Sequence, residues 1–163
     1  CILNYKLIII VNSKDTFRLL FSDKEKKKKN SKREVVVNSE VKMLEDMIIV
    51  SETDAKGNII FANQDFCKIA GYTLDELIGK PHNMVRHSDM PKVAFEDLWK
   101  TIQAGNIWKG IVKNRTKEGN YYWVNATAYP SKKTNGEIRY ISVRVKPTDK
   151  EVANAVALYA TLK

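Results

Sequence analysis

Apolar and polar residues follow a regular order only from about residue 47 onward. Met47–Val50 and Asn58–Phe61 are short apolar runs, and the turn sequence Asp54-Ala55-Lys56-Gly57 between them is typical of a β-hairpin. The pattern therefore predicts five strands, a hairpin first and a three-stranded meander last. The strands expected in the meander are Ile107–Arg115, Tyr121–Tyr129 and Ile138–Lys146.

Two short helices are predicted between the hairpin and the meander. Asn63 can cap the first helix, and Gly71 can end it. Thr73 and Glu76 have the spacing of a capping box, in which each side chain bonds the backbone N–H of the other residue. The second helix is therefore expected to begin at Thr73 and to end near Gly79.

A longer helix is predicted before the meander and a final helix after it. Asp89 is the expected cap of the longer helix, Pro91 suits its first turn, and Gly105 ends it. After Pro147, Asp149 can cap the final helix. The apolar face of the longer helix is expected to comprise Val93, Phe95, Leu98, Trp99 and Ile102.

This order of elements predicts an α+β domain. Short helices would cover one face of a five-stranded antiparallel sheet, because neither the hairpin nor the helices can bury their apolar faces alone. We expect the domain to span residues 43–147, with a basic extension at 1–42 and a C-terminal coupling helix at 148–163.

The first forty residues differ from the rest in composition. They contain no Gly or Pro and have ten Lys or Arg against five Asp or Glu, within a chain whose net charge is +9. Such a basic block is typical of a solvated segment, so no specific nucleic-acid binding is predicted, although a DNA-binding arm at residues 24–33 stays an alternative. Leu7–Val11 could form a strand and Asp15–Lys29 a helix. Because the regular pattern begins later, we expect translation to start near Met43 or Met47, and an intact mass that includes residues 1–40 would contradict this.

Cysteine content and hydropathy bear on the cellular setting. Cys1 and Cys67 cannot form a disulfide framework, which favours a reducing, cytoplasmic environment. The apolar run Leu7–Val11 is far shorter than the roughly 20 residues that cross a bilayer, so no transmembrane segment is expected. No signal peptide is expected either, because the run lacks a cationic flank before it and a small-residue cleavage site after it.

Several stretches of the chain match one branch of a known family. The most specific is His82-Asn83-Met84-Val85-Arg86-His87 followed by Met90-Pro91. The others are Ile60–Phe66, Gly71–Gly79, Trp108–Arg115, and Gly119 with Tyr122-Trp123-Val124. Over about residues 48–147 the sequence resembles the N-terminal PAS domain of bacterial aerotaxis receptors.

This resemblance implies a PAS fold that binds FAD non-covalently and passes a redox or oxygen signal to a chemotaxis-type output domain or protein. A homodimer is a further expectation. Receptors of that family continue into a membrane anchor and a helical signalling domain, which this sequence does not contain, so output is expected to need a further domain or protein. Ser88 departs from the family pattern, where Pro is usual, but Ser can also cap the helix that follows.

Aromatic and amide side chains are the first candidates for contacts to a flavin. Phe95, Trp99 and Trp108 offer flat apolar faces for the ring system, and the alternative is that they are plain core residues. Asn63 and Asn114 could bond the polar edge of the ring. Helix capping is the alternative for Asn63, and a surface strand position is the alternative for Asn114.

A polar cluster before the longer helix supplies the remaining candidates. The guanidinium of Arg86 suits a phosphate or a flavin carbonyl, and His87 titrates near neutral pH. Asp89 completes the cluster, and Tyr140 on the last expected strand is a further candidate. The alternative is a capping and ion-pair network that only holds the loop. By resemblance this loop lies beside the cofactor.

Other functions are alternatives to the flavin sensor. A haem-binding PAS domain would use His82 or His87 as an axial ligand. A light-driven adduct needs a reactive cysteine in a specific helix motif, whereas Cys67 lies in a different context. A cofactor-free PAS module for dimerisation or docking is the alternative from another class. No metal is expected, since the two histidines lack helical spacing, and no enzyme is expected, since no nucleophile–base pair, phosphate loop or kinase motif is present.

Overall fold

The computed structural model describes residues 38–162, which belong to one compact unit. The strand expected at 7–11 and the helix expected at 15–29 lie outside the described residues. The boundaries of the domain at 43 and 147 stay predictions. No helix within 38–162 has the length and apolar character needed to cross a bilayer.

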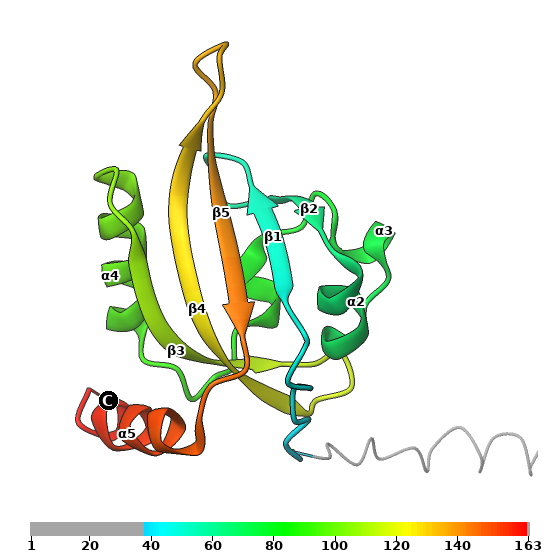
Figure 1. Cartoon of the computed structure of the whole chain (residues 1–163), viewed down its shortest axis with the longest axis vertical. Coiled ribbons are helices and arrows are strands. Elements are labelled where there is room, and N and C mark those ends of the chain that lie inside the picture. The colour runs from blue at the N-terminus through cyan, green and yellow to red at the C-terminus, as the bar shows by residue number, and fades with distance from the viewer. Residues whose placement is uncertain (1–37, 163) are drawn as a thin grey trace, which may run out of the picture. The chain divides into compact units, whose positions relative to one another are not determined.

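Five strands form one antiparallel sheet in the order β2-β1-β5-β4-β3 (Figure 1). The expected hairpin and the expected meander are both confirmed, and β5 joins them by pairing with β1. The first and last strands of the chain order are therefore neighbours in the middle of the sheet. The strands are β1 (Ile49–Thr53), β2 (Ile59–Ala62), β3 (Trp108–Arg115), β4 (Tyr121–Lys132) and β5 (Ile138–Val145).

The helices begin and end where local sequence permits. Asn63 caps the first one by accepting a bond from the N–H of Phe66, and Gly71 ends it with a φ of 75°. Thr73 and Glu76 form the expected capping box. The helices are α2 (Gln64–Ala70), α3 (Leu74–Leu77), a 3-10 helix η1 (His82–Val85), α4 (Lys92–Gln103) and α5 (Asp149–Ala160).

Two of the expected helix caps are wrong. Pro91 occupies the N-cap of α4 and makes no side-chain cap bond. The carboxylate of Asp89 instead bonds the ammonium of Lys113. Thr148, one residue before Asp149, caps α5 and forms a capping box with Glu151. The helix η1 was not predicted, because a single 3-10 turn has no periodic pattern to detect.

The main core lies between the sheet and helices α2 and α3. Its centre is formed by side chains with no exposed surface, which come from β1, β2 and β4 and from the two helices. They are Ile49, Ile59, Phe66, Leu77 and Tyr122. Helix α5 packs separately, against β3, where the hydroxyl of Tyr159 donates to the carbonyl oxygen of Ile111.

A glycine in β3 makes room for a tryptophan of the same strand. A Cβ added at Gly110 would lie closer to the ring of Trp108 than real contacts allow. We therefore expect Gly110→Ala to lower the free energy of unfolding by about 1–3 kcal/mol in a denaturant titration, as overpacked sites do. In a Trp108→Leu background, which removes the ring, the same substitution is expected to be nearly neutral. An equal loss in both backgrounds would mean that the clash is not the cause.

Candidate functional site

A cavity of about 530 Å³ lies between α4 and the inner face of the sheet. Four strands contribute to its walls, together with α4, the segment Pro81–Arg86 and the turn between β1 and β2. This volume falls within the roughly 300–1,000 Å³ of pockets that bind small molecules. The cavity is therefore large enough to hold a cofactor.

Small side chains on β4 create the cavity. Ala126 and Ala128 form its floor and are each 5% exposed, and Ala126 pairs with Gly110 of β3. On α4, Phe95 and Trp99 face this space and are only partly buried. Alanine on the sheet and large rings on the helix keep the backbones apart but leave the space between them unfilled. The sequence thus builds a hollow where a denser core would otherwise form.

Arg144 of β5 is the most unusual residue of the cavity wall. The residue is 2% exposed, and its Nη2 donates to the hydroxyl of Ser51 at 2.6 Å. Its guanidinium carbon lies 4.4 Å from the centre of the Phe66 ring, whereas its Nε has no hydrogen-bond partner. Within residues 38–162, no carboxylate forms an ion pair with it.

Among the described residues, the charge of Arg144 therefore lacks a carboxylate counterion. Burial lowers the pKa of Arg144 to about 10, so the side chain stays protonated at neutral pH. An unpaired buried cation is costly. A ligand that supplies negative charge or hydrogen-bond acceptors would offset this cost, and the adjoining cavity offers room for one.

His82 of η1 lies beside this guanidinium. Its Nε2 is 3.2 Å from the hydroxyl oxygen of Ser51 and 3.4 Å from Nη1 of Arg144. Removal of the imidazole from water, and to a lesser degree the charge of Arg144, lowers the pKa of His82 from 6.5 to about 3. The imidazole is therefore neutral at physiological pH.

The lowered pKa of His82 predicts a loss of stability in mild acid. The folded state binds a proton at His82 more weakly than the unfolded state does. The neutral imidazole therefore contributes a stability that is fully present above about pH 6.5 and is lost as pH falls toward 3. We expect the free energy of unfolding to fall by about 1.4 kcal/mol per pH unit in this window. His87, the other histidine, also has a lowered pKa, chiefly because of burial. Denaturant titrations at pH 7.5 and 5.5 are expected to show a smaller loss in His82→Gln than in the parent chain, and an equal loss would contradict the assignment.

The side chains of the segment Arg86–Met90 lie on both sides of β3. Arg86 lines the cavity, where its guanidinium lies 4.1 Å from the centre of the Phe95 ring and donates to the carbonyl oxygen of Met90. His87 does not line the cavity and stands edge-on to Tyr121.

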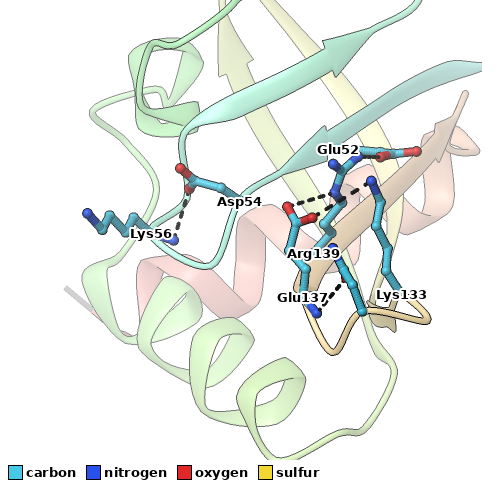
Figure 2. Close-up of polar contacts among 7 residues, drawn as sticks. Glu52, Asp54, Lys56, Lys133, Glu137 and Arg139 are labelled. Carbon is cyan, nitrogen blue, oxygen red and sulfur yellow. Dashed lines mark hydrogen bonds and ion pairs between the residues drawn. The ribbon is translucent and has the colours of Figure 1, made fainter.

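A rigid turn and a tryptophan frame another part of the cavity. The carboxylate of Asp54 accepts the backbone N–H of Lys56 at 2.9 Å, as Figure 2 shows, and that of Asn58 at 2.8 Å. The turn brings Gly57 against Trp99, since a Cβ at Gly57 would lie 3.0 Å from the indole ring. Figure 2 also shows nearby ion pairs that join Arg139 to Glu52 of β1 and to Glu137.

Five of the nine candidate residues lie together on the cavity wall. They are Arg86, Phe95, Trp99, Asn114 and Tyr140. The ring of Tyr140 packs edge-on against that of Trp99, with centroids 5.4 Å apart. These residues come from the C-terminal cap of η1, α4, β3 and β5, so only the fold brings them together.

The other four candidates are placed outside the cavity lining. The amide of Asn63 accepts from the N–H groups of Val50 and Phe66 and donates to the carbonyl of Ile48. The indole N–H of Trp108 donates to the carboxylate of Asp97. The backbone N–H of His87 donates to the carbonyl oxygen of Lys113 and its ring packs edge-on against Tyr121, whereas the carboxylate of Asp89 accepts from the ammonium of Lys113. A direct cofactor contact by these four stays a prediction.

Sequence reasoning missed the polar residues on the inner face of the central strands. Ser51, Ser142 and Arg144 line the cavity, as does His82. One signal was present: an arginine in the alternating run Ile141-Ser142-Val143-Arg144-Val145 shares its face with Ser142. Only the register of β5 between β1 and β4 shows that this face is the buried one.

Comparisons with known proteins agree with this architecture. Residues 59–150 match the family model described as the PAS fold. The chain is 46% identical over 127 residues to the aerotaxis receptor of Escherichia coli (strain K12), and the match covers 78% of this chain and 25% of the receptor. It is 30% identical over 93 residues to the nitrogen fixation regulatory protein of Klebsiella oxytoca, and this match covers 57% of this chain and 19% of that protein. The chain thus spans about a quarter or less of the length of these relatives.

A solved structure shows the same fold. The light state of the blue-light photoreceptor Aureochrome1 LOV superposes with a TM-score of 0.61 at 19% identity, covering 69% of this chain and 91% of that chain. At this identity the likeness concerns the fold alone. The family model, by contrast, matches more than half of the sequence. The chain therefore belongs to the PAS fold family.

Proposed function

We propose that this domain is a redox sensor that binds a flavin, FAD, non-covalently in the cavity between α4 and the sheet. The observation that carries the proposal is Arg144, a buried cation that has no carboxylate partner among residues 38–162 and whose Nε has no hydrogen-bond partner there. The 46% identity to an aerotaxis receptor supports the same function. The domain is proposed to sense and to signal, with no catalytic role of its own.

The walls of the cavity fit a flat aromatic ring system. Phe95, Trp99 and Tyr140 supply ring faces and edges, and the alanines of β4 supply a smooth floor. Asn114, which is 4% exposed, offers an amide at the cavity edge. The pairing of an apolar slot with a few fixed polar groups is the arrangement that small-molecule sites use for orientation.

The cations around the cavity suit the phosphates of a dinucleotide. Lys56, Arg86 and Lys92 all belong to its lining. Lysine and arginine are the side chains that bind phosphate most often. FAD, with two phosphates, is therefore proposed over riboflavin, which has none.

A bound flavin supplies electron exchange coupled to a proton change at its ring nitrogens. The residues of this chain would respond through Arg144, whose guanidinium is shared with Ser51 of β1 and His82 of η1. A change of charge in the cavity alters how strongly Arg144 is drawn away from Ser51. Because Ser51 and Arg144 lie on neighbouring central strands, the change reaches the sheet directly.

The output is proposed to lie in a further domain or protein of a chemotaxis-type signalling system. This chain covers 25% of the aerotaxis receptor that it matches, so three-quarters of that relative has no counterpart in this comparison. A cytoplasmic location and a homodimer belong to the same proposal.

Two rival chemistries have less support from the site. Cys67 is the free cysteine of the described residues and does not line the cavity, so an adduct with a bound ring lacks a thiol. Of the two histidines proposed as haem ligands, His87 lies outside the lining, and Nε2 of His82 already faces Ser51 and Arg144.

The visible absorption spectrum of the purified chain tests the proposal. We expect the two bands of an oxidised flavin, bleaching by dithionite, and release of FAD on heating. If the chain is purified without cofactor, titration with FAD, FMN and riboflavin is expected to give the tightest binding for FAD. A Soret band would assign haem instead. A protein that stays colourless after incubation with FAD would overturn the proposal and favour a cofactor-free docking module.

A further inference from the structure

One residue of β3, Lys113, makes three contacts with the loop that carries Arg86. The carbonyl oxygen of Lys113 accepts the N–H of His87 at 3.4 Å, and its N–H donates to the sulfur of Met90 at 3.3 Å. Its ammonium bonds the carboxylate of Asp89 at 2.7 Å. Three contacts along the loop therefore converge on a single strand residue.

The ammonium of Lys113 is fixed in place by its surroundings. The side chain is 11% exposed and lies 4.1 Å from the centre of the Tyr121 ring and 6.0 Å from that of Trp123. A cation over aromatic faces, paired with a carboxylate, has few alternative positions when it is this well buried. Movement of Lys113 would therefore move Asp89 and the loop with it.

The loop in turn sets the position of Arg86 in the cavity. Arg86 pairs with Asn114 through a backbone bridge, and its guanidinium closes the loop by donating to the carbonyl oxygen of Met90 at 3.1 Å. The same guanidinium covers the ring of Phe95 on α4. The Lys113 contacts thus fix one charged group and one ring of the cavity wall from the far side of β3.

The other side of this cluster binds the segment before the first strand. Tyr121 donates its N–H to the carbonyl oxygen of Ser39 at 3.0 Å and accepts the N–H of Val41 at 2.7 Å. Met43, two residues later, is 4% exposed within the core. The segment Ser39–Met43 is therefore attached to the same tyrosine whose ring supports Lys113.

We propose that Lys113 is a positioning residue of the flavin cavity and that the segment Ser39–Met43 is coupled to the cavity through Tyr121 and Lys113. This inference rests on the proposed flavin site. Coupling between two sites is reciprocal, so filling the cavity stabilises the attachment of Ser39–Met43, and loosening Lys113 weakens flavin binding. Occupancy of the cavity therefore changes the stability of a second region, the segment Ser39–Met43, in addition to the sheet.

The test compares Lys113→Met, Lys113→Arg and the control Lys109→Met. Lys109 lies on the same strand and is exposed. FAD affinity is measured by titration, and amide hydrogen exchange is followed at Val41, Tyr121 and Met90 with and without FAD. The N–H of Met90 donates to the carbonyl oxygen of His87, so it reports on the loop.

Lys113→Met is expected to bind FAD about tenfold more weakly or worse, as the loss of a charged hydrogen bond implies. Lys113→Arg is expected to recover most of the affinity, and Lys109→Met to match the parent chain. FAD is expected to slow exchange at Val41 and Tyr121 in the parent chain and to have little effect on them in Lys113→Met. Equal affinity in Lys113→Met, or unchanged exchange at Val41 on FAD binding, would overturn the inference.

Failure of the flavin site itself gives a different result. If no variant binds FAD, the proposed function fails, and the coupling is then decided by exchange in the unliganded protein. There Lys113→Met is expected to speed exchange at both Met90 and Val41, whereas Lys109→Met changes neither. Faster exchange at Met90 alone would contradict the coupling even in that case.

Discussion

Arg144→Met is expected to weaken FAD binding by about ten- to one-hundred-fold while leaving the unliganded domain at least as stable as before. The two effects have opposite signs because the same charge plays opposite roles in the two states. In the unliganded cavity, the guanidinium is buried without a carboxylate, and methionine of similar length removes that cost. In the complex, the guanidinium would supply charged hydrogen bonds to the ligand.

The neighbours of Arg144 tolerate its removal. Ser51 and His82 lose one partner but keep each other, since the hydroxyl oxygen and Nε2 are 3.2 Å apart. The side chain of methionine can also retain the contact with Phe66. No buried polar group is therefore left newly unpaired in the unliganded protein.

Titration with FAD and denaturant titration of the unliganded protein check both halves of this prediction. Arg139→Met is the matched control, because Arg139 lies on the same strand and its ion pairs with Glu52 and Glu137 are near the surface, where such pairs contribute little. It is expected to change neither quantity much. Unaltered FAD affinity in Arg144→Met would contradict a role of Arg144 in binding. A large loss of stability in the unliganded protein would show that Arg144 stabilises the fold instead.

Ala126→Leu is expected to abolish flavin binding, with a loss of more than about one-hundred-fold, while the unliganded domain becomes more stable. The leucine side chain would enter the cavity from its floor, where the ring is proposed to lie. Each added methylene that leaves water contributes about 0.8 kcal/mol, and a cavity of about 530 Å³ accommodates the side chain without overpacking.

Thr127→Leu is the control for this substitution. Thr127 follows Ala126 on β4, so its side chain points to the opposite face of the sheet. Affinity for FAD is expected to be unchanged in Thr127→Leu. Binding by Ala126→Leu with the affinity of the parent chain would mean that the ligand lies elsewhere.

The fold was predictable because its signals are local. Turn sequences around Gly57 and Gly119, the cap at Asn63 and the box at Thr73 each act within a few residues. The failed caps show the limit of such signals. Asp89 has the chemistry of a cap, but a lysine 24 residues away in the sequence competes for its carboxylate.

The cavity was only partly predictable, for the same reason. Aromatic residues, Arg86 and Asn114 could be selected by type and by resemblance, and the cavity brings five such candidates together. Arg144 could not be selected, because an arginine on a strand is normally exposed. Its burial depends on the pairing of β5 with β1, and a contact between two strands so distant in sequence has no local pattern.

The crystal structure of the chain reconstituted with FAD tests the central claim most directly. The flavin ring is expected between α4 and the Ala126 floor, with a ring atom within hydrogen-bond distance of Arg144. A second hollow lies between α4, β3 and α5, where Val93, Trp108 and Leu158 line it. FAD bound in that hollow, or anywhere else with the cavity left unfilled, would contradict the account.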